Sequence, residues 1–118
     1  MGQPVVRWQI ISANPDSTIS FYRDLFGWSE KRDNALGYRE VLTGSSGMDG
    51  GVWPAPPEAQ SFVQLFVEVP DVEKHVTRAT KLGAQVLVPA SVLPDGETMA
   101  VLRDPTGLAF GIVQSKGR

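Results

Sequence analysis

The sequence predicts an α+β fold in which a strand, a helix and three further strands occur twice in succession. Three observations predict it. Runs rich in branched and aromatic residues open each half, at residues 5–12 and 62–69, and are typical of strands. Segments with apolar residues at helical spacing follow, at residues 13–27 and 70–83. Three short strand-like runs separated by turn residues then complete each half.

The helix of the first half has clear ends. Asn14 or Asp16 can cap its N-terminus, and Gly27 ends it. Three strands are expected after it, at residues 28–34, 37–44 and 50–54. The predicted buried stripe of this helix consists of Ile19, Tyr22, Leu25 and Phe26.

The second half repeats this plan. Pro70 stands at the predicted start of the helix and Gly83 lies just past its end. Strands are expected at residues 84–90, 97–104 and 107–114, and "DPTG" has good turn chemistry between the last two. The predicted buried stripe of this helix consists of Val72, Val76, Ala79 and Leu82.

The last hairpin has a predicted register. A tight turn at residues 105–106 would pair Leu102 with Ala109 and Ala100 with Gly111. Because paired residues project to the same side of a sheet, these four small or medium side chains would leave open volume on one face. A β-bulge would change this register.

The chain is expected to form one domain over residues 1–118, because neither half alone is large enough to bury a core. The first module covers about residues 4–53 and the second about residues 62–114. Between them, "PAPPEAQS" at residues 54–61 is a stiff proline-rich linker. Each module would expose one sheet face, so two modules must join.

Composition narrows the function classes. The net charge of -2 disfavours nucleic acid and anionic membrane surfaces as partners. The absence of cysteine excludes disulfides, thiolate nucleophiles and thiolate metal sites, and suits a reducing compartment. No apolar run has the length of a membrane span, and the N-terminus lacks the pattern of a signal peptide. We therefore expect a cytoplasmic protein.

Strand alternation sorts the residues of the two opening strands into faces. In residues 5–12, one face carries Val6, Trp8 and Ile10, which suits packing under a helix. The opposite face carries Val5, Arg7, Gln9 and Ile11. In residues 62–69, Val63, Leu65 and Val67 lie opposite a mixed face of Phe62, Gln64, Phe66 and Glu68. The mixed faces are expected to line a pocket.

Three segments resemble the glyoxalase/bleomycin-resistance/dioxygenase family, also called the vicinal oxygen chelate superfamily. They are "SANPDSTISFYRDLFGW", "VEVPDVEKHVTRATKLGAQVLVP" and "AVLRDPTGLAFGIVQ". The resemblance covers nearly the whole chain and follows the same order in both modules. It implies two βαβββ modules that form a curved mixed sheet around a pocket. It also implies a homodimer, whose modules pair either within one chain or between two.

Metal-dependent members of this family hold a divalent ion with His, Glu or Gln on the first and last strands of each module. Carried over to this sequence, these positions fall on Arg7, Gln64, Gly111 and an unspecified residue of the stretch 51–53. Arginine stays protonated and repels a dication, and a single amide does not make a site. The resemblance therefore predicts a family member without a metal or other cofactor.

The predicted pocket combines aromatic walls, a fixed positive charge and two amides. Such a site suits a flat or apolar molecule with an acidic or carbonyl oxygen. Structural alternatives stay open: Arg7 pairs with Glu68 or Glu40, the two glutamines satisfy each other, and the aromatic rings serve as core or cover a module junction. The predicted ligand-binding residues are Arg7, Gln9, Trp53, Phe62, Gln64, Phe66 and Gly111.

Three functions are compatible with these residues. The favoured one is metal-independent binding of a small molecule, as in antibiotic sequestration. The second is a lyase, isomerase or dioxygenase-type enzyme, either metal-dependent or using Arg7 with Glu40 or Glu68. Acid–base chemistry would then depend on carboxylates and Tyr38, because the single histidine, His75, lies on the second helix. The third is a non-catalytic interaction module.

Overall fold

The computed structural model describes residues 2–34, 38–44 and 46–114. By its internal contacts the described chain divides into two compact units. One unit is Arg7–Gln64, and the other joins the chain before Arg7 to the chain from Leu65 onward. Gly37, part of one predicted strand, lies outside the described residues.

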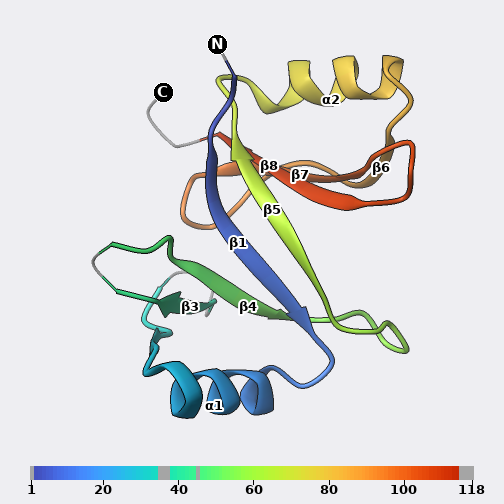
Figure 1. Cartoon of the computed structure of the whole chain (residues 1–118). Helices are drawn as coiled ribbons and strands as arrows, with labels where there is room; N and C mark the ends of the chain where they lie inside the picture. The colour runs from blue at the N-terminus through green and yellow to red at the C-terminus, as the bar shows by residue number, and fades with distance from the viewer. Residues whose placement is uncertain (1, 35–37, 45, 115–118) are drawn as a thin grey trace. The chain divides into compact units, whose positions relative to one another are not determined.

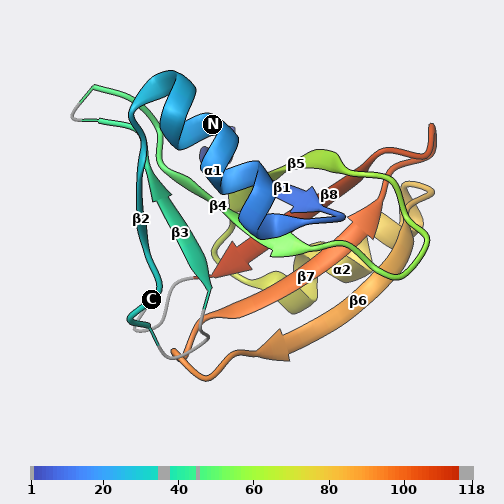
Figure 2. The same cartoon turned by 90° about the horizontal axis from the view of Figure 1, so that it is seen from below.

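The first module has one helix and four strands, drawn from blue to green in Figure 1. Its strands follow the order β2-β3-β4-β1, in which β1 and β4 are parallel and the other neighbours antiparallel. Figure 2 shows α1 lying over β4. The elements are β1 (Val5–Ser12), α1 (Pro15–Phe26), β2 (Ser29–Lys31), β3 (Arg39–Leu42) and β4 (Gly50–Pro54).

The second module repeats this arrangement with the order β5-β8-β7-β6, and β5 and β8 are its parallel pair. Its helix packs against β6, β7 and β8. The predicted α+β class with two βαβββ modules is confirmed. The elements are β5 (Phe62–Glu68), α2 (Val72–Lys81), β6 (Gln85–Val92), β7 (Thr98–Arg103) and β8 (Ala109–Gln114).

Local side chains fix the ends of both helices. The Asn14 side chain accepts a hydrogen bond from the Ser17 amide at 3.2 Å, so Asn14, and not Asp16, caps α1. Gly27 ends this helix in the left-handed region, with φ 75°. In α2 the capping side chain is Asp71. Pro70 therefore precedes the cap and is not the first helical residue as predicted.

Each helix covers a small apolar core on one face of its own sheet. In the first module, Trp8 and Ile10 pack with a buried cluster of Ile19, Val41 and Val52. In the second, Val67 packs with a buried cluster of Val69, Val72, Ala100, Leu102 and Ile112. The predicted assignment of Trp8, Ile10 and Val67 to the helix side is confirmed.

Both predicted helical stripes are wrong at their C-terminal ends, where Leu25, Phe26 and Leu82 are exposed. Leu25 lies about 120° around the helix from Ile19, at 100° per residue, so it cannot face the same sheet. Phe26 ends the helix and its ring lies beside that of Trp28, with centroids 5.3 Å apart. Leu82 is the C-cap of α2 and lies beyond the packed turns.

Three residues expected under a helix, Val6, Val63 and Leu65, are exposed instead. The physical reason for Leu65 is the position of α2, which lies over β6, β7 and β8. The alternation of β5 is thus as predicted, but the helix covers other strands of the module.

The predicted register of the last hairpin is wrong by one residue. Ala100 pairs with Ile112, Leu102 with Phe110 and Val101 with Gly111. The chain between β7 and β8 closes through a hydrogen bond from the Asp104 amide to the Leu108 carbonyl, 2.8 Å long, which makes a longer turn than residues 105–106 alone. Ala100 and Leu102 consequently lie in the core under α2 and form no pocket floor.

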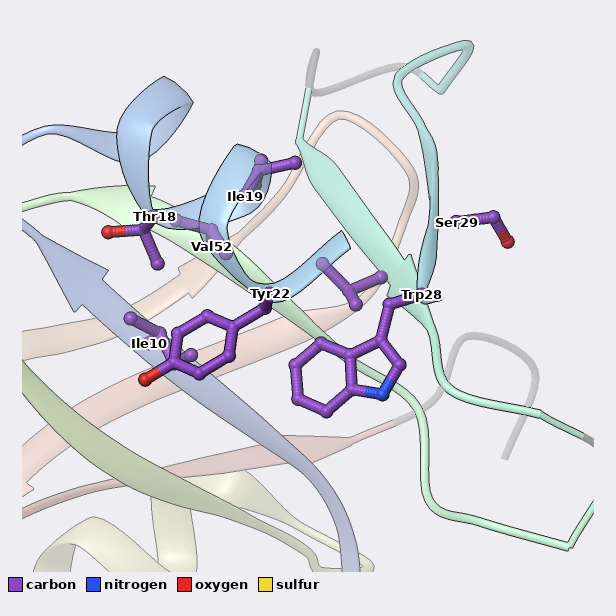
Figure 3. A pocket seen from close by; sticks show the side chains of 8 residues that line it. Ile10, Thr18, Ile19, Tyr22, Trp28, Ser29 and Val52 are labelled. Atoms are coloured by element: carbon purple, nitrogen blue, oxygen red, sulfur yellow. The ribbon is translucent and has the colours of Figure 1, made fainter. Parts of the chain in front are cut away.

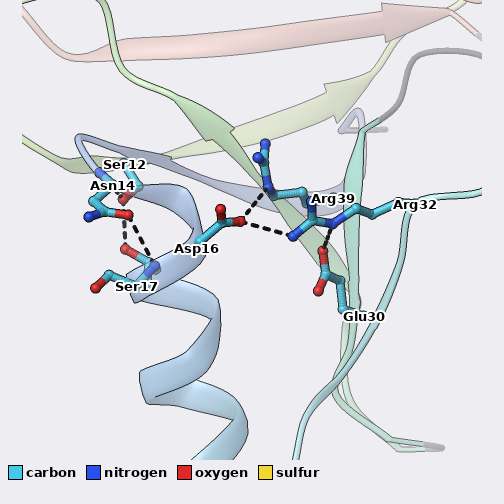
Figure 4. Close-up of polar contacts among 8 residues, drawn as sticks. Ser12, Asn14, Asp16, Ser17, Glu30, Arg32 and Arg39 are labelled. Carbon is cyan, nitrogen blue, oxygen red and sulfur yellow. Dashed lines mark hydrogen bonds and ion pairs between the residues drawn. The ribbon is translucent and has the colours of Figure 1, made fainter.

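An ion cluster ties the first turn of α1 to the neighbouring strands (Figure 4). The Asp16 carboxylate lies 2.9 Å from an Arg32 nitrogen and 3.4 Å from Arg39 Nε, and Arg32 also pairs with Glu30. The hydrogen bond from Arg32 is the main cause that lowers the pKa of Asp16. Because Asp16 and Arg32 at the centre of the cluster are exposed, the cluster orients the helix more than it stabilises the fold.

The β7–β8 turn makes stability depend on pH. The Asp104 carboxylate accepts hydrogen bonds from the Thr106 hydroxyl at 2.6 Å, the Thr106 amide at 2.8 Å and the Leu108 amide at 3.1 Å. The hydrogen bond from the Thr106 hydroxyl is the main cause that lowers the pKa of Asp104 below its ordinary value of 3.8, and the backbone hydrogen bonds lower this pKa further. A lowered folded-state pKa gives stability that is present above 3.8 and is lost as the pH falls below it.

We therefore expect Asp104→Asn to lower the Tm at pH 7 and to flatten the acid limb of a plot of Tm against pH. Thermal melts followed by circular dichroism between about pH 2 and pH 7 measure both effects. The control is Asp24→Asn, an exposed carboxylate outside the turn. An unchanged acid limb in Asp104→Asn would show that the turn does not contribute to acid sensitivity.

Candidate functional site

A row of residues crosses the first-module sheet on the face opposite α1. Gln9 on β1 pairs with Gly51 on β4, and Gly51 pairs with Glu40 on β3. Paired residues project to the same side of a sheet, so these positions share one face. Because the neighbours Trp8 and Ile10 pack under α1, this face points away from the helix.

Tyr38 lies over the glycine in the middle of this row. A Cβ atom at position 51 would come within 1.8 Å of the Tyr38 hydroxyl oxygen and 2.0 Å of its ring carbon Cζ. Glycine is therefore required here for the tyrosine to lie flat against the strand. The Tyr38 ring lies beside the Trp53 ring, with ring centroids 6.0 Å apart and planes tilted by 37°. The half-exposed indole of Trp53 leaves an accessible aromatic surface beside the row.

Two opposite charges act on the Tyr38 hydroxyl. Burial is the main cause that raises the pKa of Tyr38 to about 12; the positive charge of Arg7 lowers it and the negative charge of Glu40 raises it. The hydroxyl thus stays protonated near neutral pH and acts as a donor. Its oxygen is buried and has no hydrogen-bond partner within the described parts of the chain. A protonated hydroxyl that lacks an acceptor, near a guanidinium, can donate a hydrogen bond to an anionic oxygen.

Strand β5 carries three of the predicted ligand-binding residues, and they differ in exposure. Gln64 is 6% exposed, and no described group forms a hydrogen bond with its side-chain oxygen. Phe66 is 1% exposed, and its ring covers Gly111, where a Cβ atom would come within 2.2 Å of ring carbon Cε1. This supports the alternative in which Phe66 serves as core. Phe62 is exposed at the start of the strand.

The structure brings some predicted residues together and adds others. Arg7, Gln9 and Trp53 belong to one unit with Tyr38 and Glu40. Tyr38 was expected only as an acid–base group, and its place over the sheet was missed. The one signal was the glycine on the adjacent strand, which predicts a close approach by some neighbour without naming it. Ligand contacts by Phe62, Gln64, Phe66 and Gly111 stay predictions.

The positions that the family resemblance assigns to metal ligands do not fit a divalent cation. On the last strands, Gly111 stands under the ring of Phe66, and Gly51, the first residue of the stretch 51–53, stands under that of Tyr38, so a carboxylate at either glycine would have to move a ring. Residues 52 and 53 are Val and Trp, which offer no ligand oxygen. On the first strands, Arg7 offers only donors and Gln64 one neutral oxygen. Within the described ranges, no group of three or more His, Asp or Glu residues is placed to hold a metal.

A small cavity under α1 is a packing gap and not a ligand site (Figure 3). Its volume is about 10 Å³, which leaves room for no more than one water molecule. The only polar side chains among its lining residues besides the aromatic ones are Thr18 and Ser29. The Thr18 hydroxyl is already hydrogen-bonded to that of Ser12 at 2.6 Å.

Comparison with known families identifies the chain's relationship. The model of the glyoxalase-like domain family matches residues 8–113, which include both modules. The chain belongs to this family. It is thereby a member of the vicinal oxygen chelate superfamily, as its sequence resemblance predicts. Across the described residues, no helix is long and apolar enough to cross a membrane.

Curated relatives share sequence over much of the chain. CFP32 of Mycobacterium bovis and of Mycobacterium tuberculosis, whose name assigns it provisionally to the glyoxylases, is 31% identical over 103 residues. The match covers 80% of this chain but 39% of the relative. The chain thus spans about two fifths of the length of these relatives.

Solved structures share the fold. Methylmalonyl-CoA epimerase of Streptomyces coelicolor, in complex with 2-nitronate-propionyl-CoA, is 18% identical with a TM-score of 0.63, covering 98% of this chain and 96% of that one. A hypothetical protein of Bacillus halodurans is 12% identical with a TM-score of 0.69, covering 100% and 98%. At these identities the likeness concerns the fold alone.

Proposed function

We propose that this chain binds a small aromatic or amphipathic molecule with an anionic oxygen, without a divalent metal, on the sheet face of Arg7, Gln9, Tyr38 and Trp53. One observation carries the proposal. The Tyr38 hydroxyl is buried and protonated, feels the charge of Arg7, and has no hydrogen-bond partner in the described chain. A ligand oxygen would supply the missing acceptor.

The side chains on this sheet face suit both the anionic oxygen and the apolar ring of such a molecule. A guanidinium forms charge-assisted hydrogen bonds with a carboxylate or enolate oxygen, and these are about twice as strong as neutral ones. The exposed indole of Trp53 offers a flat apolar surface for a ring. Glu40 on the same row disfavours a second negative charge, so we propose a monoanion.

Catalysis is the second candidate, and the position of Glu40 favours it. Glu40 acts on the Tyr38 hydroxyl electrostatically and shares a row with Gln9. A carboxylate that takes a proton from carbon next to a carbonyl, with Arg7 and Tyr38 holding the enolate oxygen, would give lyase or isomerase chemistry. Methylmalonyl-CoA epimerases, which share this fold, have been solved in complex with acyl-CoA ligands, and this supports an acyl-CoA as a candidate substrate.

Isothermal titration calorimetry with 1-naphthoate and its neutral isostere 1-naphthamide tests the proposal. We expect the acid to bind at least about 10-fold more tightly, because one charge-assisted contact is worth about 1.5–3 kcal/mol. Trp53→Leu should weaken both ligands, whereas Phe26→Leu, an exposed aromatic on α1, should change neither. Equal affinities for acid and amide, or no binding of either at millimolar concentration, would contradict the proposal.

Recovery of the ligand separates binding from catalysis. Chromatography after incubation should return a bound carboxylate unchanged if the chain only sequesters it, as a bleomycin-resistance-type protein would. Consumption of acyl-CoA or α-keto acid substrates, lost in Glu40→Gln, would favour the enzyme. Stoichiometric metal in protein purified without chelator would contradict metal independence.

The remaining assignments are also proposals. We propose a cytoplasmic location, since a chain without cysteine suits a reducing compartment. We propose that residues 1–118 act as one domain with a linker at residues 54–61, and that the chain forms a homodimer.

A further inference from the structure

The side chain of Asn34 binds both main-chain polar groups of Tyr38. Its oxygen Oδ1 accepts a hydrogen bond from the Tyr38 amide at 2.9 Å, and its nitrogen Nδ2 donates one to the Tyr38 carbonyl at 2.8 Å. A side-chain amide offers an acceptor and a donor on separate atoms, which suits it to this double contact. Two residues that face each other as a hydrogen-bonded pair in an antiparallel sheet exchange the same two bonds. The Asn34 side chain therefore replaces a strand neighbour for Tyr38.

The pairing of β2 with β3 ends before it reaches Tyr38. The last pair of this ladder is Lys31 with Glu40. Tyr38 lies just before β3, which begins at Arg39. Its carbonyl also accepts a hydrogen bond from the Glu40 amide, 3.1 Å long. The two bonds from Asn34 thus keep the main chain of Tyr38 in line with β3 beyond the point where the strand pairing stops.

The line of the main chain determines where the Tyr38 ring lies. In extended chain, residues two apart point to the same face, so Tyr38 shares the face of Glu40. Glu40 is paired with Gly51 on β4. The Tyr38 ring lies over this glycine, where a Cβ atom would come within 1.8 Å of the hydroxyl oxygen. A turn of the Tyr38 main chain would move the ring away from this face and from Gly51.

The contribution of Asn34 concerns the place of the ring more than the stability of the module. Both of its hydrogen bonds to Tyr38 are exposed, so water can replace either partner at little cost. The Tyr38 hydroxyl oxygen, in contrast, is buried. Loss of the Asn34 side chain should therefore leave the module folded and release the tyrosine from its place.

We propose that Asn34 is a positioning residue of the candidate ligand site, whose amide holds the main chain of Tyr38 so that the ring and hydroxyl lie over Gly51. Asn34 acts through Tyr38 and contacts no ligand itself. Its role in ligand binding rests on the function proposed above, whereas the placement of the ring does not. The two parts are therefore tested by separate measurements.

NMR spectroscopy of the isotope-labelled protein without ligand tests the placement. The wild type should show nuclear Overhauser effects between the Tyr38 ring protons and the Gly51 α-protons, because the ring lies against this glycine. We expect Asn34→Ala to lose these effects. Asn14→Ala is the matched control, since it removes another asparagine side chain that binds a main-chain amide, that of Ser17. It should lower the Tm and leave the Tyr38–Gly51 effects intact.

Calorimetric titration with 1-naphthoate tests the link to the proposed function. Tyr38→Phe and Asn34→Ala should each weaken binding by about 10-fold, the loss expected for one hydrogen bond to a charged oxygen. The double variant should bind no more weakly than Tyr38→Phe alone, because Asn34 acts through the hydroxyl that phenylalanine lacks. Asn14→Ala should bind as the wild type does.

Circular dichroism melts check that each variant folds, and Asn34→Asp serves if Asn34→Ala does not. Aspartate can still accept the bond from the Tyr38 amide but cannot donate to the carbonyl at neutral pH, so the Tyr38–Gly51 effects should weaken. A wild type without these effects, or a folded Asn34→Ala that keeps them, would overturn the proposal. Their loss in Asn14→Ala would overturn it as well, because general destabilisation would then explain the result.

The affinities separate this inference from the proposed function. Additive losses in the double variant would overturn the proposal, because Asn34 would then act on the ligand by a route other than Tyr38. Loss of the Tyr38–Gly51 effects with unchanged naphthoate affinity would support the positioning role and contradict the proposed function. A wild type that binds no naphthoate would contradict the proposed function alone, since the placement is measured without ligand.

Discussion

Gly111→Ala is expected to destabilise the protein by about 3 kcal/mol, at the upper end of overpacking costs in a protein core. The added methyl would lie 2.2 Å from ring carbon Cε1 of Phe66, well inside van der Waals contact. The ring cannot swing away into solvent, because Phe66 is almost fully buried and faces Gly111 across a parallel strand pair. Urea denaturation followed by circular dichroism measures the loss as a lower midpoint with an unchanged slope.

A double-mutant cycle tests whether contact with the Phe66 ring causes the loss of stability in Gly111→Ala. Phe66→Leu should itself destabilise by about 1–2 kcal/mol, but combined with Gly111→Ala it should cost clearly less than the sum, since the smaller side chain makes room for the methyl. Gly2→Ala is the matched control, because no atom lies within 4 Å of a Cβ built there. Strict additivity of the two core changes would show that ring and glycine do not interact.

The parts of the fold that follow local rules could be predicted from the sequence. Helix α1 is capped by Asn14 and Gly27, because side-chain capping and the left-handed conformation act within a few residues. The faces of β1 and β5 follow from strict alternation, which places Trp8 and Val67 under helices and Gln9 and Phe66 opposite.

The parts that depend on contacts distant in sequence could not be predicted. The β7–β8 register depends on the hydrogen bond between residues 104 and 108, which closes the hairpin. A shift of the register by one residue changes which face of the sheet Ala100 shares with its partner. Leu65 is exposed because α2 lies over β6, β7 and β8, a choice that alternation does not encode. Tyr38 lies before β3 and covers Gly51 on β4, so its place in the candidate site becomes visible only once those strands are paired.

Arg7→Met is expected to abolish the preference for an acid over its amide, with a loss of about 10–100-fold in affinity for 1-naphthoate. Methionine retains most of the length and apolar surface of the arginine stem, so packing around β1 should be preserved while the charge is lost. Affinity for 1-naphthamide should stay nearly unchanged, because a neutral ligand gains little from the guanidinium. Isothermal titration calorimetry of both ligands measures the two effects on one variant.

The protonation state of Tyr38 and a control variant serve to attribute the loss of naphthoate affinity to anion recognition. Arg7 lowers the pKa of Tyr38, so its removal raises that pKa further, and the hydroxyl remains a donor at neutral pH. Arg39→Met is the matched control: it removes the same charge from the same sheet, but Arg39 pairs with Asp16 at the start of α1. If Arg39→Met weakens naphthoate as much as Arg7→Met does, the net charge of the protein governs binding, and the local site does not recognise the anion. A fall in affinity for acid and amide alike in Arg7→Met would instead point to damaged packing along β1.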